Sequence, residues 1–226
     1  MTGEIVLRPA TPADAKALAY LWMVTFPDKF GPVLGEQGEQ ILYDWFCLSQ
    51  RHIETTTLLE VDGLAVGFIV LETASAPQVD SGRWLWHALQ LHNGIFGALR
   101  SFMMMILLDH DYQPGQNEVY IELLGVDPAW RGRGFGRQLI AHAEATAWAE
   151  QVGQLTLNVV CDNGPAIALY RKLSFEVAGE YQSKILKWLT GHSGYYKMVK
   201  RLTIDDGNPR SDAGREFRNE DCHNSY

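Results

Sequence analysis

The sequence predicts a mixed α/β fold, in which one central sheet is flanked by helices. Short β-rich runs alternate with amphipathic stretches of helical length along most of the chain. Asp62-Gly63, a strong hairpin pattern, joins two of the β-rich runs and makes part of the sheet antiparallel. A long apolar segment then provides two further helices. We expect residues 1–202 to form one domain, because a chain of 226 residues can bury a full core.

The N-terminal segment predicts a strand followed by a capped helix. The strand is the apolar run 5–7. Thr11 is the predicted N-cap, Pro12 the first helical residue, and Asp14 completes an acidic variant of the capping box. Helical spacing continues through Leu18, Leu21, Trp22 and Thr25.

The elements that follow alternate between helix and strand. A second helix is predicted over 37–50, and the hairpin strands are 56–61 and 65–72. An insert, 73–117, holds an apolar stretch with a break at Asn93-Gly94, which predicts two packed helices. The remaining predicted elements are a strand over 118–126, a helix over 134–151, a strand over 155–160, a helix over 163–173, and strands over 175–181 and 195–202.

The charge is distributed unevenly. The chain holds 19 Lys and Arg against 27 Asp and Glu, a formal net charge of −8. Residues 203–226 are rich in Gly, Asn, Ser and acidic side chains, so we expect a flexible acidic C-terminal tail. The acidic balance argues against a nucleic-acid partner.

Cysteine spacing and hydropathy indicate where the protein works. Cys47, Cys161 and Cys222 form no CxxC pair and no zinc-ligand spacing, so we expect no metal and a reduced, cytoplasmic protein. No secretory signal is visible at the N-terminus. The best membrane candidate, 94–108, is shorter than a spanning helix and contains Arg100, so we expect no membrane partner.

A glycine-rich, basic turn lies between the strand 118–126 and the next helix. Glycines at alternate positions allow positive φ angles and let a ligand approach the backbone closely. The N–H groups and dipole of the following helix favour an anion, most naturally a phosphate. Three arginines add full positive charge. The turn consists of Arg131, Gly132, Arg133, Gly134, Phe135, Gly136 and Arg137.

Two common nucleotide signatures are absent from this turn. A G-x-G-x-x-G fingerprint would need glycine at Arg137 or at Leu139, and the next strand ends without the carboxylate that binds a ribose. A P-loop would need Gly-Lys-Ser/Thr, which is missing.

The turn does match the R/Q-x-x-G-x-G/A signature of the GNAT (GCN5-related) N-acetyltransferases. The strand around Leu123 to Pro128 resembles the strand that precedes this signature, and the opening 7–14 resembles the family's usual start. Residues 163–175 resemble its N-x-x-A-x-x-L-Y-x-x-x-G-F block, with Ser174 where glycine is usual. The resemblance implies a GNAT fold: a mixed, mostly antiparallel sheet flanked by helices, with the helical insert between strands 3 and 4.

The resemblance also implies a function and a set of site residues. The chain would transfer the acetyl group of acetyl-CoA to a primary amine by direct attack through a tetrahedral intermediate. The turn from Arg131 to Arg137 would bind the pyrophosphate. The strand end Leu124, Gly125 and Val126 would hold the pantetheine arm and polarise the thioester. Asn163 would lie along the arm or cap the helix after it.

Two side chains are candidates for proton transfer. Tyr170 matches the tyrosine that donates a proton to the leaving sulfur. Glu122, which alternation places on the same face as Leu124 and Val126, could accept the amine proton directly or through water. Asn158 stands where some protein-acetylating branches have a glutamate, and an amide cannot act as a base.

Several alternatives stay open at this point. The acceptor is an amine-bearing small molecule or a protein. The insert is an extra helical layer, a lid or wall of the acceptor pocket, or the surface of a homodimer. The other function that fits the same fold is a non-catalytic acyl-CoA-binding sensor.

Overall fold

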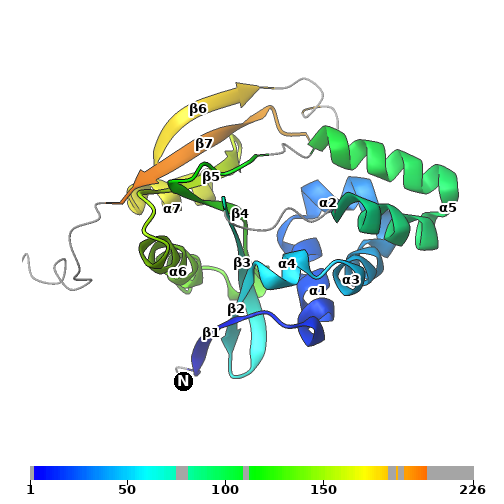
Figure 1. The fold of residues 1–226 in the computed structure, drawn as a ribbon, viewed down its shortest axis with the longest axis horizontal. Helices are drawn as coiled ribbons and strands as arrows, with labels where there is room; N and C mark the ends of the chain where they lie inside the picture. The colour runs from blue at the N-terminus through cyan, green and yellow to red at the C-terminus, as the bar shows by residue number, and fades with distance from the viewer. Residues whose placement is uncertain (1–2, 75–80, 109–111, 183–186, 188–190, 203–226) are drawn as a thin grey trace, which may run out of the picture.

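The computed structural model describes residues 3–74, 81–108, 112–182, 187 and 191–202. Over this part of the chain seven strands form one sheet in the order β1-β2-β3-β4-β5-β7-β6 (Figure 1). Neighbouring strands are antiparallel except for β4 and β5, which are parallel. This mixed, mostly antiparallel sheet confirms the predicted fold class. The strands are β1 (Ile5–Pro9), β2 (Thr56–Val61), β3 (Leu64–Thr73), β4 (Glu118–Val126), β5 (Gln154–Val160), β6 (Glu176–Gln182) and β7 (Gly194–Arg201).

Helices cover both faces of the sheet. α6 (Phe135–Ala149) and α7 (Gly164–Lys172) lie on one face, and the other α-helices lie on the opposite face (Figure 1). This second group comprises α1 (Ala15–Thr25), α2 (Pro27–Leu34), α3 (Gly38–Leu48), α4 (Arg51–Glu54) and α5 (Ser81–Leu108). Short 3₁₀ turns occupy Pro12–Asp14, Gly35–Gln37 and Pro128–Trp130.

Each face of the sheet has its own hydrophobic core. The core under α1 to α5 includes Trp22, Phe46 and Leu89. The core under α6 and α7 includes Leu139 and Leu155. The alternating side chains of the central strands contribute to both cores, so the sheet is buried on both faces and the strands read as nearly continuous apolar runs.

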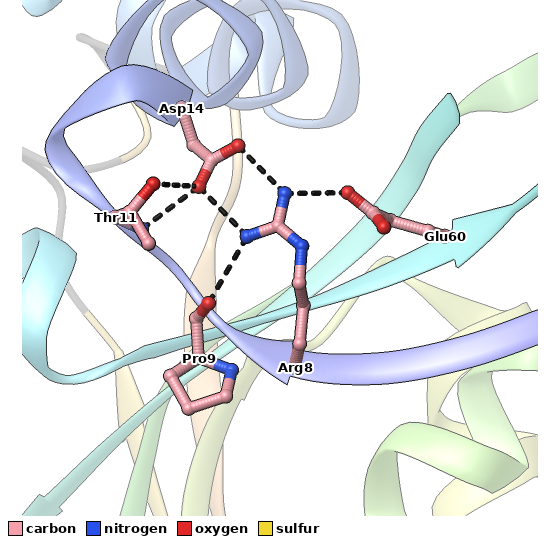
Figure 2. A network of polar contacts seen from close by, with 5 residues as sticks. All are labelled: Arg8, Pro9, Thr11, Asp14 and Glu60. Atoms are coloured by element: carbon pink, nitrogen blue, oxygen red, sulfur yellow. Dashed lines mark hydrogen bonds and ion pairs between the residues drawn. The ribbon is translucent and has the colours of Figure 1, made fainter. Parts of the chain in front are cut away.

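The predicted N-terminal cap is present and forms part of a larger network (Figure 2). The backbone N–H and the hydroxyl of Thr11 both donate to the Asp14 carboxylate, at 2.8 and 2.7 Å. The Arg8 guanidinium donates to both oxygens of Asp14 and also to Glu60 on β2, at 2.5 Å. This network ties β1, the start of α1 and β2 together.

The predicted hairpin and the break in the insert are both confirmed. Asp62 and Gly63 have φ angles of 51° and 78°, as a two-residue turn with two positive φ values requires. In α5, Gly94 has φ 61° and ψ 179°, so the helix consists of two parts that meet at this residue.

Two helices were not predicted, and their sequences explain why. α2 begins with Pro27 and contains Gly31 and Pro32, which interrupt the pattern expected of a helix. α4 is a single turn between α3 and β2, too short for periodicity to be visible. The predicted helix over 37–50 is confirmed as α3.

Some predictions lie outside the described residues. The whole of the predicted acidic tail, 203–226, lies there, and Cys222 is part of it. Cys47 and Cys161 are free thiols. In the part of the chain that the structure describes, no helix is long and apolar enough to cross a membrane.

Candidate active site

A large cavity opens where two parallel strands separate. β4 and β5 pair only from Glu118 with Gln154 to Ile121 with Leu157, although both strands continue beyond these residues. From Glu122 onward, the edge of β4 that faces away from β3 therefore presents backbone N–H and C=O groups that β5 does not use. The cavity has a volume of about 1360 Å³ and is lined by both strand ends.

A β-bulge occurs at Glu122. Val70 of β3 pairs with Leu123, whereas Leu71 pairs with Ile121, so β4 has one extra residue here. Ile121 packs in the α6 and α7 core, whereas Leu123 packs in the opposite core.

The expectation that Glu122 shares a face with Leu124 and Val126 is therefore wrong. Those two side chains pack in the α6 and α7 core. Glu122 instead lies near Glu72 and Tyr120, whose pKa values its charge helps to raise. The bulge interrupts the simple alternation on which the expectation depended. Glu122 still lines the cavity.

The glycine-rich turn adopts the conformation its composition suggests. Gly132 and Gly134 have φ angles of 77° and 84°. Gly134 is the N-cap of α6, and its carbonyl accepts the N–H groups of Arg137 and Gln138. The first N–H groups of the helix have no partner within it, and the turn lines the cavity, so these donors are available to an anion there.

The three arginines of the turn differ in their surroundings. Arg131 and Arg137 line the cavity. The Arg131 Nε also donates to the Val126 carbonyl at 3.0 Å, which joins the turn to the end of β4. The Arg133 guanidinium lies 4.5 Å from the centre of the Trp130 ring and is not among the residues that line the cavity. The structure thus brings two of the three arginines to the cavity.

α7 contributes two of the predicted side chains. The Asn163 Oδ1 accepts the N–H of Ala166 at 3.2 Å, so Asn163 caps this helix while it also lines the cavity. Tyr170 is buried, contacts Phe175 and lines the cavity as well. Burial raises the pKa of the Tyr170 phenol to about 12.

The opposite wall of the cavity contains residues that sequence reasoning missed. Glu72 on β3 forms an ion pair with Arg51 on α4, with 2.6 Å between Oε1 and NH2. Burial, followed by the charge of Glu122, raises the pKa of Glu72. Ordinary strand alternation gave no reason to single out Glu72, and Arg51 is distant in sequence.

Aromatic and aliphatic side chains complete that wall. Trp22, Phe30 and Trp45 come from α1, α2 and α3, and Phe26 lies between α1 and α2. Those from α5 are Leu85, Phe102 and Met105. Asn158 on β5 also lines the cavity and donates to the Tyr120 hydroxyl at 3.2 Å. The insert is therefore both a helical layer over the core and a wall of the cavity. Within the described residues no three His, Cys, Asp or Glu side chains come together as a metal site.

Curated relatives match this chain over a limited segment. The mycothiol acetyltransferase of Clavibacter michiganensis is 44% identical over 64 residues, which cover 28% of this chain and 20% of that protein. The N-alpha-acetyltransferase RimI of Mycobacterium tuberculosis is 40% identical over 62 residues, 27% of this chain and 37% of that protein. The matched segment therefore spans only about a fifth of the first relative and less than two fifths of the second.

Solved structures resemble this chain over most of its length. The match with a structure described as an acetyltransferase covers 87% of this chain and 98% of the chain in that structure, with a TM-score of 0.61 and 23% identity. The PaiA N-acetyltransferase from Thermoplasma acidophilum, in complex with coenzyme A, covers 88% of this chain and 99% of its own, with a TM-score of 0.56 and 14% identity. At these identities the likeness concerns the fold.

The family itself is identified from the sequence. The profile of the acetyltransferase (GNAT) family matches residues 16–175, well over half of the chain. This range includes the separating strands, the glycine-rich turn and Tyr170. The chain belongs to the GNAT acetyltransferase family.

Proposed function

We propose that this protein transfers the acetyl group of acetyl-CoA to a primary amine. The observation that carries the proposal is the combination of three features at one cavity. The pairing of β4 with β5 ends at Ile121, the glycine-rich turn begins α6 beside the opening, and Tyr170 lines the same space. Family membership supports the same function.

The residues present fit acetyl-CoA in two respects. The open edge of β4 from Leu124 to Val126 could hydrogen-bond the amide groups of a pantetheine arm as an added strand would. The turn from Gly132 to Gly136, with Arg131 and Arg137, could bind a pyrophosphate. A side chain at Gly136 would approach Leu169 to 3.0 Å, so glycine also keeps α6 and α7 close together here.

The proposed reaction needs a proton acceptor and a proton donor, and Glu122 and Tyr170 are proposed for these roles. An amine reacts only when neutral, and Glu122 is the proposed base that removes the ammonium proton, directly or through water. The amine nitrogen then bonds to the thioester carbon, the C–S bond breaks, and Tyr170 gives its proton to the departing sulfur. The remaining excess proton on nitrogen returns through water to the tyrosinate, so that one proton in total reaches solvent.

The raised pKa of Tyr170 is consistent with this role. With a pKa of about 12 the phenol keeps its proton at neutral pH, as a proton donor must. Backbone N–H groups near Val126 are candidates for stabilising the oxyanion. Asn163, which caps α7, is a candidate for contact with the arm.

Two measurements test the proposal. Acetyl-CoA is expected to raise the melting temperature and to bind saturably. Release of free coenzyme A in the presence of a panel of amines is expected, and Tyr170→Phe is expected to lower kcat about 100-fold with acetyl-CoA binding retained. Tyr43→Phe, on α3 and outside the cavity lining, is the control and should leave the rate unchanged.

The outcomes separate the alternatives. If acetyl-CoA neither binds nor stabilises the protein, the proposal is wrong. Binding without amine-dependent release of coenzyme A would instead favour the non-catalytic acyl-CoA sensor.

Location and assembly remain predictions. We propose a cytoplasmic protein on the basis of its sparse cysteines. A homodimer is also a prediction, and α5 offers a surface for it, since Leu91, Ile95, Phe96, Leu99 and Met103 are exposed.

A further inference from the structure

The wall of the cavity opposite α7 has an apolar, aromatic character. Trp22, Phe30 and Trp45 line it and belong to one group of contacting rings: Trp22 stacks on Phe30 at 5.4 Å and meets Trp45 edge-on at 6.2 Å between centroids. Leu85 and Phe102 of α5 extend this wall. Rigid aromatic walls favour an apolar group of ring size over a flexible polar chain.

The charged groups on the same side of the sheet favour a single positive charge. Asp28 and Lys29, which are neighbours at the start of α2, balance one another. Arg51 is paired with Glu72, and Glu122 is the further carboxylate. Counted formally, with the glutamates ionised and the lining histidines His52 and His192 neutral, this side of the cavity has one negative charge in excess, which suits one ammonium group and not a polycation.

The charges of Glu72 and Glu122 oppose each other. Burial and the charge of Glu122 both raise the pKa of Glu72. A cation between the two carboxylates would relieve that repulsion, whereas a carboxylate on the ligand would increase it.

Trp22 provides a second, independent indication of a ligand. Its side chain is 2% exposed and lines the cavity, yet the indole Nε1–H has no hydrogen-bond acceptor among the described residues. A buried donor without an acceptor is unfavourable. An oxygen on the ligand could accept this hydrogen bond.

We infer that the acceptor is a small, singly charged primary amine on a ring-sized apolar group that bears an oxygen, with its ammonium at Glu72 and Glu122 and its ring against Trp22, Phe30 and Trp45. This inference rests on the proposed function, since it names the acceptor of that reaction. Glu72 binds the ammonium, and Glu122 takes its proton.

An amine panel tests the inference with the purified full chain and acetyl-CoA. Tyramine is the probe, because it combines one amine, one ring and one hydroxyl oxygen. The kcat/KM for tyramine is expected to be at least about ten times higher than that for butylamine, spermidine, L-tyrosine or a short peptide with a free N-terminus. 2-Phenylethylamine, which lacks the oxygen, should fall between tyramine and butylamine.

A matched pair of variants tests the role of Glu72. Glu72→Gln is expected to raise the KM for tyramine about tenfold or more while acetyl-CoA binding is retained. Glu60→Gln is the control, because Glu60 forms a similarly short ion pair with Arg8 (Figure 2), 2.5 Å against 2.6 Å, at a similar side-chain exposure, 14% against 13%. Glu60 does not line the cavity. It should leave the KM unchanged.

The possible failures are distinguishable. If spermidine, butylamine, L-tyrosine or the peptide has a higher kcat/KM than tyramine, the inferred acceptor class is wrong but the proposed function stands. Equal values for tyramine and 2-phenylethylamine overturn the contact with Trp22. If Glu60→Gln raises the KM as much as Glu72→Gln, direct binding of the amine by Glu72 is wrong. Absence of acetyl-CoA binding overturns the proposed function itself.

Discussion

At the scale of single residues, Tyr170 belongs to the hydrophobic core and lines the cavity at the same time. It packs against Phe175 in the core under α6 and α7. The burial that makes Tyr170 a core residue also raises its pKa. Packing and protonation are therefore linked at this position, so a substitution near Tyr170 that admits water should lower its pKa.

The Asp14 network gives a prediction at the same scale. Asp14→Asn removes a carboxylate that accepts hydrogen bonds from Arg8 and Thr11, and we expect it to cost about 1 kcal/mol of unfolding free energy at neutral pH. Urea unfolding measures this difference. Glu4→Gln, at an exposed position, is the control and should change stability little.

The effect of Asp14 should depend on pH. The hydrogen bond from Arg8 is the largest influence on the pKa of Asp14 and lowers it below that of an ordinary aspartate. Hydrogen bonds from the Thr11 hydroxyl and backbone N–H lower it further. The stabilisation is therefore complete above the unfolded-state pKa, near 3.8, and is lost as the pH falls through the lower folded-state value. A difference between wild type and Asp14→Asn that stays constant into strong acid would contradict this account.

Sequence reasoning could name the candidate site residues that lie close together in the chain. The turn from Arg131 to Arg137 and the segment from Asn163 to Tyr170 are contiguous patterns, so the residues could be named before the fold was known. Glu72, Arg51 and Trp22 come from three different elements. Only the packing of α1 and α4 against β3 brings them to one wall, and no local pattern encodes that.

At the scale of elements, the end of α7 explains one departure from the family pattern. Ser174 stands where glycine is usual and has a φ angle of 65°. The helix ends here with the Phe175 N–H bonded to the Tyr170 carbonyl at 2.9 Å. The backbone position requires the left-handed region, which glycine adopts without strain.

We therefore expect Ser174→Gly to stabilise the protein by about 1 kcal/mol. The measurement is the midpoint of chemical unfolding. Arg171→Gly, inside the same helix, is the matched control and should destabilise by about 1 kcal/mol, because glycine is unfavourable at a helical position. Loss of stability in both variants would mean that the φ angle at Ser174 carries no strain.

Element boundaries followed from the sequence wherever local chemistry defines them. The Asp62-Gly63 turn, the Thr11 to Asp14 cap and the break at Gly94 all depend on residues with special backbone or capping behaviour. The bulge at Glu122 has no such marker, because it arises from the register with β3. The bulge therefore explains why the prediction that Glu122 shares a face with Leu124 and Val126 is wrong.

At the scale of the whole molecule, the insert belongs to the main core. Leu89 of α5 is fully buried together with Trp22 and Phe46. The Ser101 hydroxyl donates to the Val33 carbonyl at 2.6 Å, which joins α5 to α2. The insert is therefore an integral layer of the fold and not an appendage.

Leu89→Ala should consequently cost about 2–5 kcal/mol of unfolding free energy, through lost burial and a residual cavity. Leu91→Ala, two residues along the same helix but 62% exposed, is the matched control and should change stability by less than about 0.5 kcal/mol. Thermal or urea unfolding compares the two. Equal effects would contradict the placement of α5 within the core.

The extra residue in β4 also affects how this sequence is compared with others. Before Glu122 the odd-numbered positions of the strand, Val119 and Ile121, pack under α6 and α7, whereas after it the even-numbered positions, Leu124 and Val126, do so. An alignment that puts a gap on the wrong side of position 122 would assign several residues to the wrong face of the sheet, and so to the wrong core, while still matching apolar with apolar. The odd–even parity of β4 is therefore a stricter check on such an alignment than its percentage identity.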